Sequence, residues 1–464
     1  MSTATASSTA ALLPSDAKPP KSKSASYYSV HPHWQDVVPI PQADQTGTLA
    51  AIAYSARYSE AMSYLRALMA ENEVSERALA LTEDLISMNP AHYTVWIYRM
   101  RVLRGLWTAS GDILNTKIVE IEDESDTSGA QTDQLDETLW DNIRSELKWL
   151  DEVSFRNLKN YQIWHHRHAL ADLLPTDPAS PTTSTSEPSP QLGTALHERL
   201  STFIASEQTF LAQILSLDTK NYHVWSYRQW LCTRFPTFLL PSPIASPNQP
   251  SIAPTYRTHP EVHAITTLID DDTRNNSAWS HRYFLLFGHH ELHHAQSATP
   301  PLILKQVNED RLLHKAGLVD TQLVQAEITY TQAEIRKAPQ NGSTWNYLRG
   351  VLRHGAVDIA KLRGFCEEFV GPDGDLWTDQ WVGGDDEVQD ASADISNEQT
   401  QGQELGVRSS HAVEWLSEIY GQDGTEEGIN RAKECLRALS EKWDVIRKGY
   451  WEWRAERLEA GKTD

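Results

Sequence analysis

The chain has 464 residues, of which 40% are hydrophobic and 22% are charged, and its formal net charge is −22. This composition is typical of a folded globular protein, and the negative charge argues against nucleic acid or an anionic membrane surface as the main partner. The three cysteines lie far apart, so they suggest neither a disulfide framework nor a thiolate metal site, and they favour a reducing compartment.

Residues 1–27, which begin MSTATASSTA, are predicted to form a disordered tail. This start lacks the basic residues and the apolar run of a secretory signal peptide. Along the rest of the chain, no stretch reaches the ~18 uninterrupted apolar residues that a membrane-spanning helix needs. We therefore expect a cytoplasmic protein.

Five copies of one short motif then follow one another along the chain. The residue four before the motif's Trp is Asn in four copies, and the residue two after it is Tyr or His in all five. The residue three after it is Arg in four copies and Leu348 in the fifth. The copies read HYTVWIYRM (92–100), NYQIWHHRH (160–168), NYHVWSYRQ (221–229), NNSAWSHRY (275–283) and NGSTWNYLR (341–349).

Each copy is predicted to open a helix. An Asn at that position caps a helix by accepting a hydrogen bond from a free N–H of its first turn. Apolar residues four and seven positions after the Trp share its helical face. Helix-like stretches precede the caps, for example 75–88 and 206–218. Each unit is thus a helix–turn–helix, and stacked pairs of this kind bury a continuous core, which predicts an all-α fold, an α-solenoid.

Successive Trp residues of the motif lie 54 to 68 residues apart, well beyond the ~34 of a compact two-helix repeat. Inserted segments account for the excess, and their polar, Pro-rich or acidic composition predicts loops. These segments are about 117–137, 175–193, 236–254 and 369–407. After residue 408, three further helical stretches are expected to close the chain.

Packing explains most repeated Trp and Arg residues in a solenoid, since an Arg stem lies on aromatic faces while its head binds carbonyl groups. Arg167 is accordingly predicted to be a member of a buried structural ion pair. Residues 290–294 read HELHH, the H-E-x-x-H pattern of zinc metalloproteases, but they run into an insertion and offer no third ligand. We expect no metal site in this chain.

Copies of the form N-Y-x-x-W-x-[HY]-R resemble the protein prenyltransferase alpha-subunit repeat. HWQDVVPIPQ (33–42), IAYSARYSEAMSYLRAL (52–68) and YTVW (93–96) are similar to the N-terminal half of the alpha subunit shared by protein farnesyltransferase and type I geranylgeranyltransferase. DVIRKGYW (444–451) is similar to the C-terminal helix of that family. The resemblance implies one repeat domain over residues 28–464, with the insertions as loops.

The resemblance also implies an enzyme that works as a heterodimer. An alpha subunit of this family wraps round a farnesyltransferase or geranylgeranyltransferase type I beta subunit, which holds the catalytic zinc and most of the isoprenoid pocket. The reaction moves a farnesyl or geranylgeranyl group from its diphosphate to the cysteine thiol of a C-terminal C-a-a-X motif, as in small GTPases. Magnesium accompanies the diphosphate.

Site residues follow from the resemblance at the two copies that read Lys-Asn-Tyr. Lys159 is expected to reach the diphosphate leaving group, where a cation stabilises the developing charge. Gln162 is expected to contact the free carboxylate of the C-a-a-X peptide. The remaining candidates are expected to line the mouth of the active site: Tyr161, Asn221, Tyr222 and His223.

Two alternatives stay open from the sequence. The alpha subunit of Rab geranylgeranyltransferase shares the repeat but usually carries additional domains, including leucine-rich repeats, and none is recognised here. A protein-binding scaffold of the tetratricopeptide kind would have no catalytic role, but its helical pairs would have short, even spacing rather than this motif.

Overall fold

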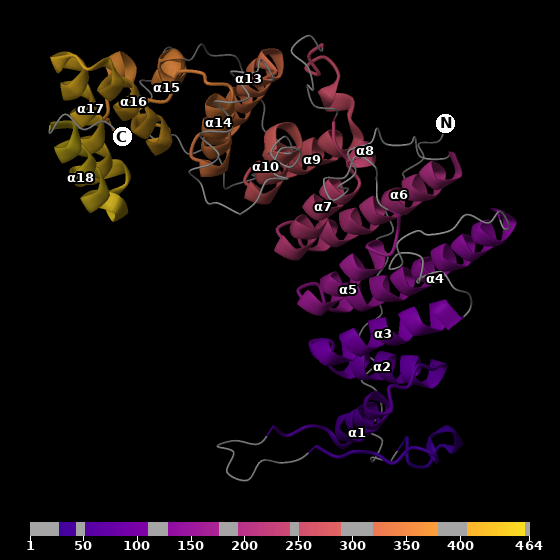
Figure 1. Cartoon of the computed structure of the whole chain (residues 1–464). Helices are drawn as coiled ribbons and strands as arrows, with labels where there is room; N and C mark the ends of the chain where they lie inside the picture. Colours follow the sequence, from indigo (N-terminus) through magenta and orange to yellow (C-terminus); the bar gives the residue numbers. More distant parts are fainter. Residues whose placement is uncertain are drawn as a thin grey trace, which may run out of the picture. The chain divides into compact units, whose positions relative to one another are not determined.

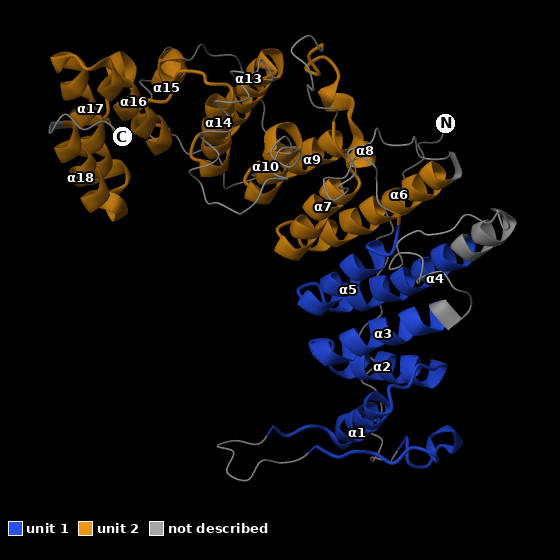
Figure 2. Ribbon diagram, viewed as in Figure 1, with its two compact units in different colours: residues 1–174 blue, residues 175–464 orange. Residues whose placement is uncertain are grey.

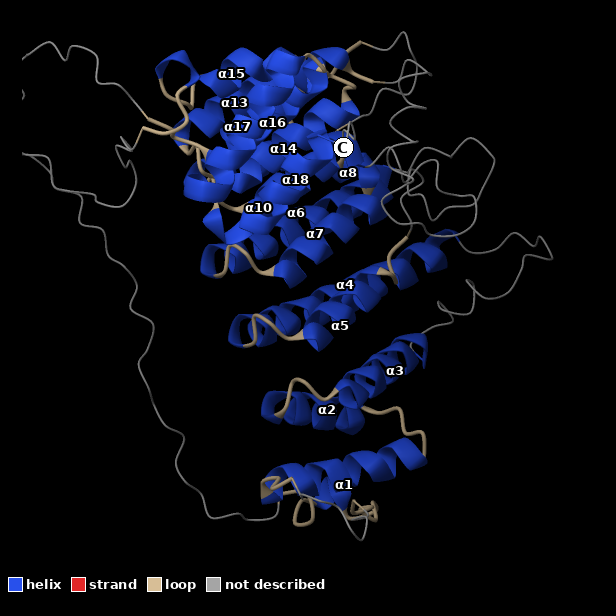
Figure 3. Ribbon diagram, turned by 90° about the vertical axis from the view of Figure 1, so that its left-hand side faces the viewer, coloured by secondary structure: helices blue, strands red, loops and turns tan. Residues whose placement is uncertain are grey.

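The structure is a computed structural model, and it describes residues 27–42, 52–109, 129–175, 194–241, 250–288, 319–378 and 406–459. Regular structure in these ranges is helical, and none of them contains a strand (Figure 1). The chain divides into two compact units, residues 1–174 and residues 175–464 (Figure 2). Helices that are neighbours in the chain pack on one another within each unit, and Figure 3 shows this stacking for the first unit, which confirms the predicted all-α solenoid.

The first unit is a stack in which α1 packs on α2, α2 on α3, α3 on α5, and α4 on α5. Fully buried aliphatic side chains such as Leu65, Leu85 and Leu150 fill the space between the helices. The helices are α1 (Ala56–Ala70), α2 (Glu76–Met88), α3 (Tyr93–Ala109), α4 (Gly129–Arg156) and α5 (Tyr161–Ala171).

An N-terminal segment, residues 27–42, lies along α1. It contains the short 3₁₀-helix η1 (Pro32–Trp34). The rings of Tyr28 and Trp34 meet Tyr64 of α1 with centroids 5.4 Å away in each case. The backbone N–H of Ile40 donates to the carbonyl of Ser63 at 3.0 Å, and the Arg66 guanidinium donates to the carbonyl of Ile40 at 2.7 Å. Aromatic packing and backbone hydrogen bonds therefore hold this segment in place.

The second unit continues the same pairing of helices. Contacts join α6 to α7, α9 to α10, α13 to α14 and α16 to α17, and α10 also packs on α7 and α14. Its longer elements are α6 (Thr194–Leu217), α7 (Tyr222–Arg234), α9 (Pro260–Asp271), α10 (Asn276–Tyr283), α13 (Thr321–Lys337), α14 (Gly342–His354), α16 (Ser410–Asp423), α17 (Glu426–Ala438) and α18 (Lys448–Glu459). Shorter ones are α8 (Pro236–Leu239), η3 (Tyr256–Thr258), η4 (Phe284–Gly288), η5 (Ile359–Leu362), α15 (Arg363–Glu367), η6 (Pro372–Gly374), η7 (Leu439–Trp443) and η8 (Val445–Arg447).

The predicted asparagine caps are confirmed in all four copies that carry one. Asn160 caps α5, Asn221 caps α7, Asn275 caps α10 and Asn341 caps α14, each through its side-chain oxygen. A hydrogen bond to a first-turn N–H replaces the partner that the helix itself cannot supply. The motif thus sets where the second helix of each pair begins.

Two of the predicted loops are shorter than expected. Residues 129–137 belong to α4, and residues 236–239 form α8, so the loop predictions for 117–137 and 236–254 are wrong over those stretches. Polar composition misled the first prediction, because α4 needs only one apolar stripe to pack. Phe369 and Leu376 of the predicted loop 369–407 are buried as well. The other parts of the predicted loops, and residues 1–26, lie largely outside the described residues.

The three helical stretches expected after residue 408 are confirmed as α16, α17 and α18. Among the described residues, no helix is both long enough and apolar enough to span a membrane. The single repeat domain over residues 28–464 stays a prediction beside the two compact units.

Candidate functional site

The motif's Trp side chains are anchors of the fold. In four copies the indole N–H donates to a backbone carbonyl six residues earlier, in the turn that joins the two helices of the pair. These bonds run from Trp96 to Pro90 at 2.8 Å, Trp225 to Thr219 at 3.0 Å, Trp279 to Thr273 at 2.8 Å and Trp345 to Pro339 at 2.9 Å. The ring fills the core while its polar edge closes the turn. The repeated Trp therefore has a structural role in these four copies.

A buried glutamate explains the Arg three residues after the Trp. In the first unit, Arg99 of α3 donates to both carboxylate oxygens of Glu146 of α4, at 2.6 and 2.7 Å. His166 of α5, two residues after the next motif Trp, contacts the same carboxylate at 2.9 Å. One glutamate thus joins two successive helical pairs. Arg99, Glu146 and His166 are all buried, so the loss of one of them would leave a buried charge or polar group without its partner.

The second unit repeats this arrangement. Arg228 of α7 and His281 of α10 meet at Glu261 of α9. In the next pair, Arg282 of α10 donates to both oxygens of Glu327 of α13, which also accepts from Tyr347 of α14. In copies two to five, the Tyr or His two residues after the Trp is therefore a further hydrogen-bond partner of the glutamate.

The fifth copy breaks the pattern, and the structure shows how the break is accommodated. Leu348 replaces the Arg and is fully buried. The neighbouring Arg349 instead donates to both oxygens of Glu418 in α16, at 2.7 and 3.0 Å. Arg167, for its part, is 1% exposed and pairs with Asp151 at 2.6 Å, which confirms its predicted structural role.

Burial and pairing act against each other at these glutamates. Burial alone would raise the pKa of Glu146, but hydrogen bonds from His166 and Arg99 lower it to about 2. Burial lowers the pKa of His166 and likewise that of His281, so both imidazoles are neutral near pH 7. The glutamate is the charged partner of the Arg, and the His is a neutral hydrogen-bond partner.

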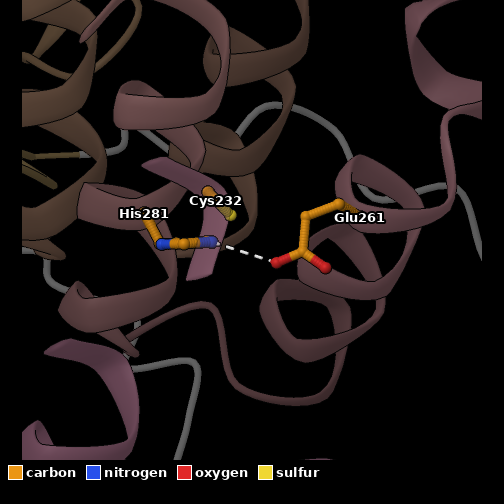
Figure 4. Close-up of side chains that lie close together, drawn as sticks. All are labelled: Cys232, Glu261 and His281. Carbon is orange, nitrogen blue, oxygen red and sulfur yellow. Dashed lines mark hydrogen bonds and ion pairs between the residues drawn. The ribbon is translucent and has the colours of Figure 1, made fainter. Parts of the chain in front are cut away.

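One group of side chains resembles a metal site in composition. Polar atoms of Cys232, Glu261 and His281 lie within 4.8 Å of one another in the second unit (Figure 4). Arg228, however, donates to both oxygens of Glu261, at 2.5 and 3.0 Å. Burial raises the pKa of Cys232 well above its usual range and keeps the thiol protonated. A guanidinium already neutralises the carboxylate, so these residues do not fit a zinc ion.

Three of the predicted site residues lie together at the start of α5. Lys159 is exposed in the turn between α4 and α5, directly before the cap residue Asn160. Tyr161, the first residue of α5, is 64% exposed. Gln162 is half-buried, and its backbone N–H donates to the Asn160 side chain at 2.8 Å. The helix entrance therefore presents a cation, a phenol and an amide side by side.

The other three predicted site residues lie at the corresponding start of α7 in the second unit. Asn221 is buried and caps the helix, and Tyr222 is 51% exposed. The ring of Tyr222 lies 3.9 Å from that of His223, centroid to centroid, and His223 is only 5% exposed. Lys220, just before the cap, pairs with Asp272 at 3.0 Å. At the start of α7, the Lys220 ammonium group is therefore paired with a carboxylate, and the His223 imidazole is buried beside the ring of Tyr222.

This arrangement can bind and orient an anion at the α5 entrance, where an ammonium group and a side-chain amide are close in sequence and the surface is accessible. The buried glutamates do different work, because guanidinium, imidazole and phenol groups occupy their oxygens. His290, Glu291 and His294 of the H-E-x-x-H pattern lie outside the described residues.

Sequence reasoning missed the glutamates. A signal was present: Glu146, Glu207, Glu261 and Glu327 each stand 18 residues before the motif Trp of copies two to five. In all four cases the glutamate contacts the residue 20 positions later. The spacing is constant because the turn between the helices has a constant length, whereas the insertions fall elsewhere.

Known proteins share this architecture. The family described as protein prenyltransferase alpha subunit repeat matches residues 75–106, 143–174, 204–235 and 260–288. These matches hold the first four copies of the motif.

Two relatives differ in how much of each chain they share. The alpha subunit of Candida albicans protein farnesyltransferase/geranylgeranyltransferase type-1 is 28% identical over 426 residues, which cover 92% of this chain and 97% of that protein. The alpha subunit of rat geranylgeranyl transferase type-2 is 25% identical over 280 residues, 60% of this chain and 34% of that protein.

A solved structure of Candida albicans protein geranylgeranyltransferase-I complexed with GGPP has a chain that superposes with a TM-score of 0.57 at 27% identity. The superposition covers 91% of this chain and 98% of the other. The four repeat matches fall on the helical pairs of this chain. The two similarities to the Candida albicans proteins run over almost the whole chain. Four segments of this chain thus match the protein prenyltransferase alpha subunit repeat.

Proposed function

We propose that this chain is the alpha subunit of a C-a-a-X protein prenyltransferase, an enzyme that transfers a farnesyl or geranylgeranyl group to a cysteine thiol. The observation that carries the proposal is the end-to-end similarity to the Candida albicans farnesyltransferase/geranylgeranyltransferase type-1 alpha subunit, 97% of which is covered. The type-2 relative is covered over only 34% of its length, which favours the type-1 assignment over the Rab enzyme.

Lys159 is the residue that we propose for the chemical step. When the isoprenoid carbon leaves its diphosphate, negative charge grows on the leaving oxygen, and a cation at that place lowers the barrier. The ammonium group is suited to this because it lies at an accessible helix entrance, where a substrate held by another subunit can approach it. Its part is electrostatic, and no proton has to move.

The neighbouring residues are proposed to bind rather than to react. Gln162 carries an amide N–H that can donate to the terminal carboxylate of the peptide substrate. The exposed phenol rings of Tyr161 and Tyr222 offer apolar faces with a polar tip at the rim. Asn221 holds the start of α7, and His223 would act on substrate only after Tyr222 moves from its ring.

The partner is proposed to be a beta subunit of the farnesyltransferase or geranylgeranyltransferase type I kind, and that subunit would supply the catalytic zinc. The poor fit of Cys232, Glu261 and His281 to a zinc ion supports this division of labour. Zinc would activate the acceptor thiol by favouring its thiolate form, and magnesium would accompany the diphosphate.

The experiment is co-expression of the chain with a candidate beta subunit and an assay of farnesyl and geranylgeranyl transfer to a C-a-a-X peptide. Lys159→Ala is compared with Lys220→Ala, because Lys220 stands at the same position in the next copy of the motif. We expect Lys159→Ala to lower kcat by about 10²–10³-fold with little change in peptide KM. An intact complex that is indifferent to Lys159 would reduce this chain to a scaffold.

A further inference from the structure

An open pocket of about 300 Å³ lies between α10 and α14 of the second unit, two helices that pack on each other (Figure 1). We call this pocket the α10–α14 groove. Its lining residues on α10 run from Asn276 to Tyr283, and those on α14 run from Ser343 to Arg353. Ten residue steps along α14 correspond to about 15 Å of helix, so the groove is elongated.

The motif differs between the helices that form the groove and those that precede them. In the first three copies, the first residue of the motif helix is an exposed Tyr: Tyr93, Tyr161 and Tyr222. In the fourth and fifth copies it is Asn276 and Gly342. Smaller residues thus stand at the two helix starts beside the groove, and no bulky ring covers it there.

The floor of the groove is aromatic. Trp279 and Tyr347 line it and are only 1% and 5% exposed. The indole N–H of Trp279 donates to the turn before α10, and the hydroxyl group of Tyr347 donates to Glu327. Because their polar groups are already bound, these two residues offer the groove their apolar rings.

The rim of the groove carries amide and hydroxyl groups. They belong to Asn276 and Ser280 of α10 and to Ser343 and Asn346 of α14. Within the described part of the chain, none of these four side chains forms a hydrogen bond through its polar atoms. Each of them can both donate and accept. They therefore match the N–H and C=O groups that alternate along an extended peptide backbone.

One charged residue lies at the end of the groove opposite Ser343. Arg353 is exposed in the last turn of α14, and none of the nine lining residues is acidic. Among the described residues, no carboxylate pairs with its guanidinium. Glu418 shares a neighbouring pocket with Arg353, but Arg349 donates to both of its oxygens. The groove thus has a local charge of +1 in a chain whose net charge is −22.

We propose that the α10–α14 groove binds an extended, acidic segment of a partner protein. An extended strand advances about 3.3 Å per residue, so about four or five residues span the 15 Å between Ser343 and Arg353. The rim binds the peptide backbone, and the aromatic floor packs against side chains. A Glu or Asp of the partner binds Arg353 through paired, charge-assisted hydrogen bonds. This binding does not depend on prenyl transfer.

The test measures binding of the full-length chain to three pools of immobilised hexapeptides. The four central residues are randomised, and the two end residues are both Glu, both Gln or both Lys. We expect half-maximal binding to the Glu pool at a chain concentration about tenfold lower than for the Gln pool. Non-specific attraction predicts the opposite order for a chain of this net charge, with the Lys pool bound best.

Two variants locate the binding. Arg353→Gln should remove the preference for the Glu pool, and Asn346→Ala should weaken binding to the Glu and Gln pools by about three- to tenfold. Arg431→Gln on α17 and Gln325→Ala on α13 are the matched controls, because both residues are exposed on helices and neither lines the groove. Both controls, and Lys159→Ala, should bind the pools like the parent chain.

Equal binding to the three pools, binding to none of them, or equal losses in the groove variants and their controls would overturn the proposal. Self-association of the chain that Asn346→Ala abolishes, measured by light scattering, would do the same by assigning the groove to a second copy. Melting temperatures like that of the parent would show that the variants are folded.

Discussion

Glu327 offers the sharpest test of the glutamate bridges, because its substitution should destabilise the second unit far more than the loss of a surface ion pair. Its carboxylate is fully buried and accepts four hydrogen bonds. Arg282 supplies two of them at 2.7 Å, and the hydroxyl groups of Tyr256 and Tyr347 supply the other two at 2.5 Å. The glutamate therefore satisfies three buried polar side chains at once.

Glu327→Ala would leave the guanidinium of Arg282 in the core without its counter-charge. Removal of one partner of a buried ion pair costs about 3–5 kcal/mol in the free energy of unfolding. Each kcal/mol lowers the melting temperature of a domain of about 150–250 residues by about 2–4 °C. Because the second unit, residues 175–464, is somewhat larger, we expect a fall near the lower end of about 6–20 °C. Tryptophan fluorescence during thermal unfolding measures it, since Trp279 and Trp345 lie in the same part of the unit.

Glu368→Ala is the matched control. Glu368 accepts two hydrogen bonds from Arg336, both at 2.8 Å, but both side chains are more than 40% exposed. Water screens this pair, so its loss should cost less than about 1 kcal/mol. A double variant, Arg282→Met with Glu327→Leu, removes both buried charges and should recover the part of the stability that the unpaired guanidinium costs, although the hydroxyl groups of Tyr256 and Tyr347 still lose their acceptor. Equal melting temperatures for the two alanine variants, or a double variant no better than Glu327→Ala, would refute the reasoning.

Further outcomes can be measured on the same material. Because burial lowers the pKa of His281, the unfolded state takes up a proton at a higher pH than the folded state does. The free energy of unfolding therefore keeps this contribution above about pH 6.5 and loses it as the pH falls further. His281→Gln should flatten the dependence of the unfolding free energy on pH between about pH 7 and pH 5, and an unchanged slope would contradict this origin. Asn275→Ala should cost about 1–2 kcal/mol in chemical denaturation, because its side chain caps α10 and also donates to the carbonyl of Thr219. Addition of zinc or a chelator to the isolated chain should leave its melting temperature unchanged, whereas a shift that Cys232→Ala abolishes would show that the buried cluster does bind metal.

Much of the fold was predictable because its signals are local. An Asn that caps a helix, and apolar residues at helical spacing, act within one or two turns, so the five motif copies located the second helices without knowledge of their neighbours. Composition was a poorer guide to the insertions. Residues 129–137 are largely polar and nevertheless lie in α4.

The candidate site was predictable only through resemblance to a family. Lys159 and Lys220 occupy the same position in two nearly identical hexapeptides, and nothing in their local sequence distinguishes them. The structure adds that Lys220 pairs with Asp272, a residue 52 positions away. It likewise shows Tyr222 against the ring of His223, which the sequence could not indicate.

The sequence by itself determined the helical pairs and their caps, because these depend on residues close together in the chain. Only the tertiary structure decided which charges are buried together: Arg99 with Glu146, Arg228 with Glu261 and Arg282 with Glu327. A guanidinium is stable in the core only beside an anion, and that anion comes from the next helical pair, tens of residues further on. The partner of each of these three Arg residues is therefore a property of the stack rather than of the motif.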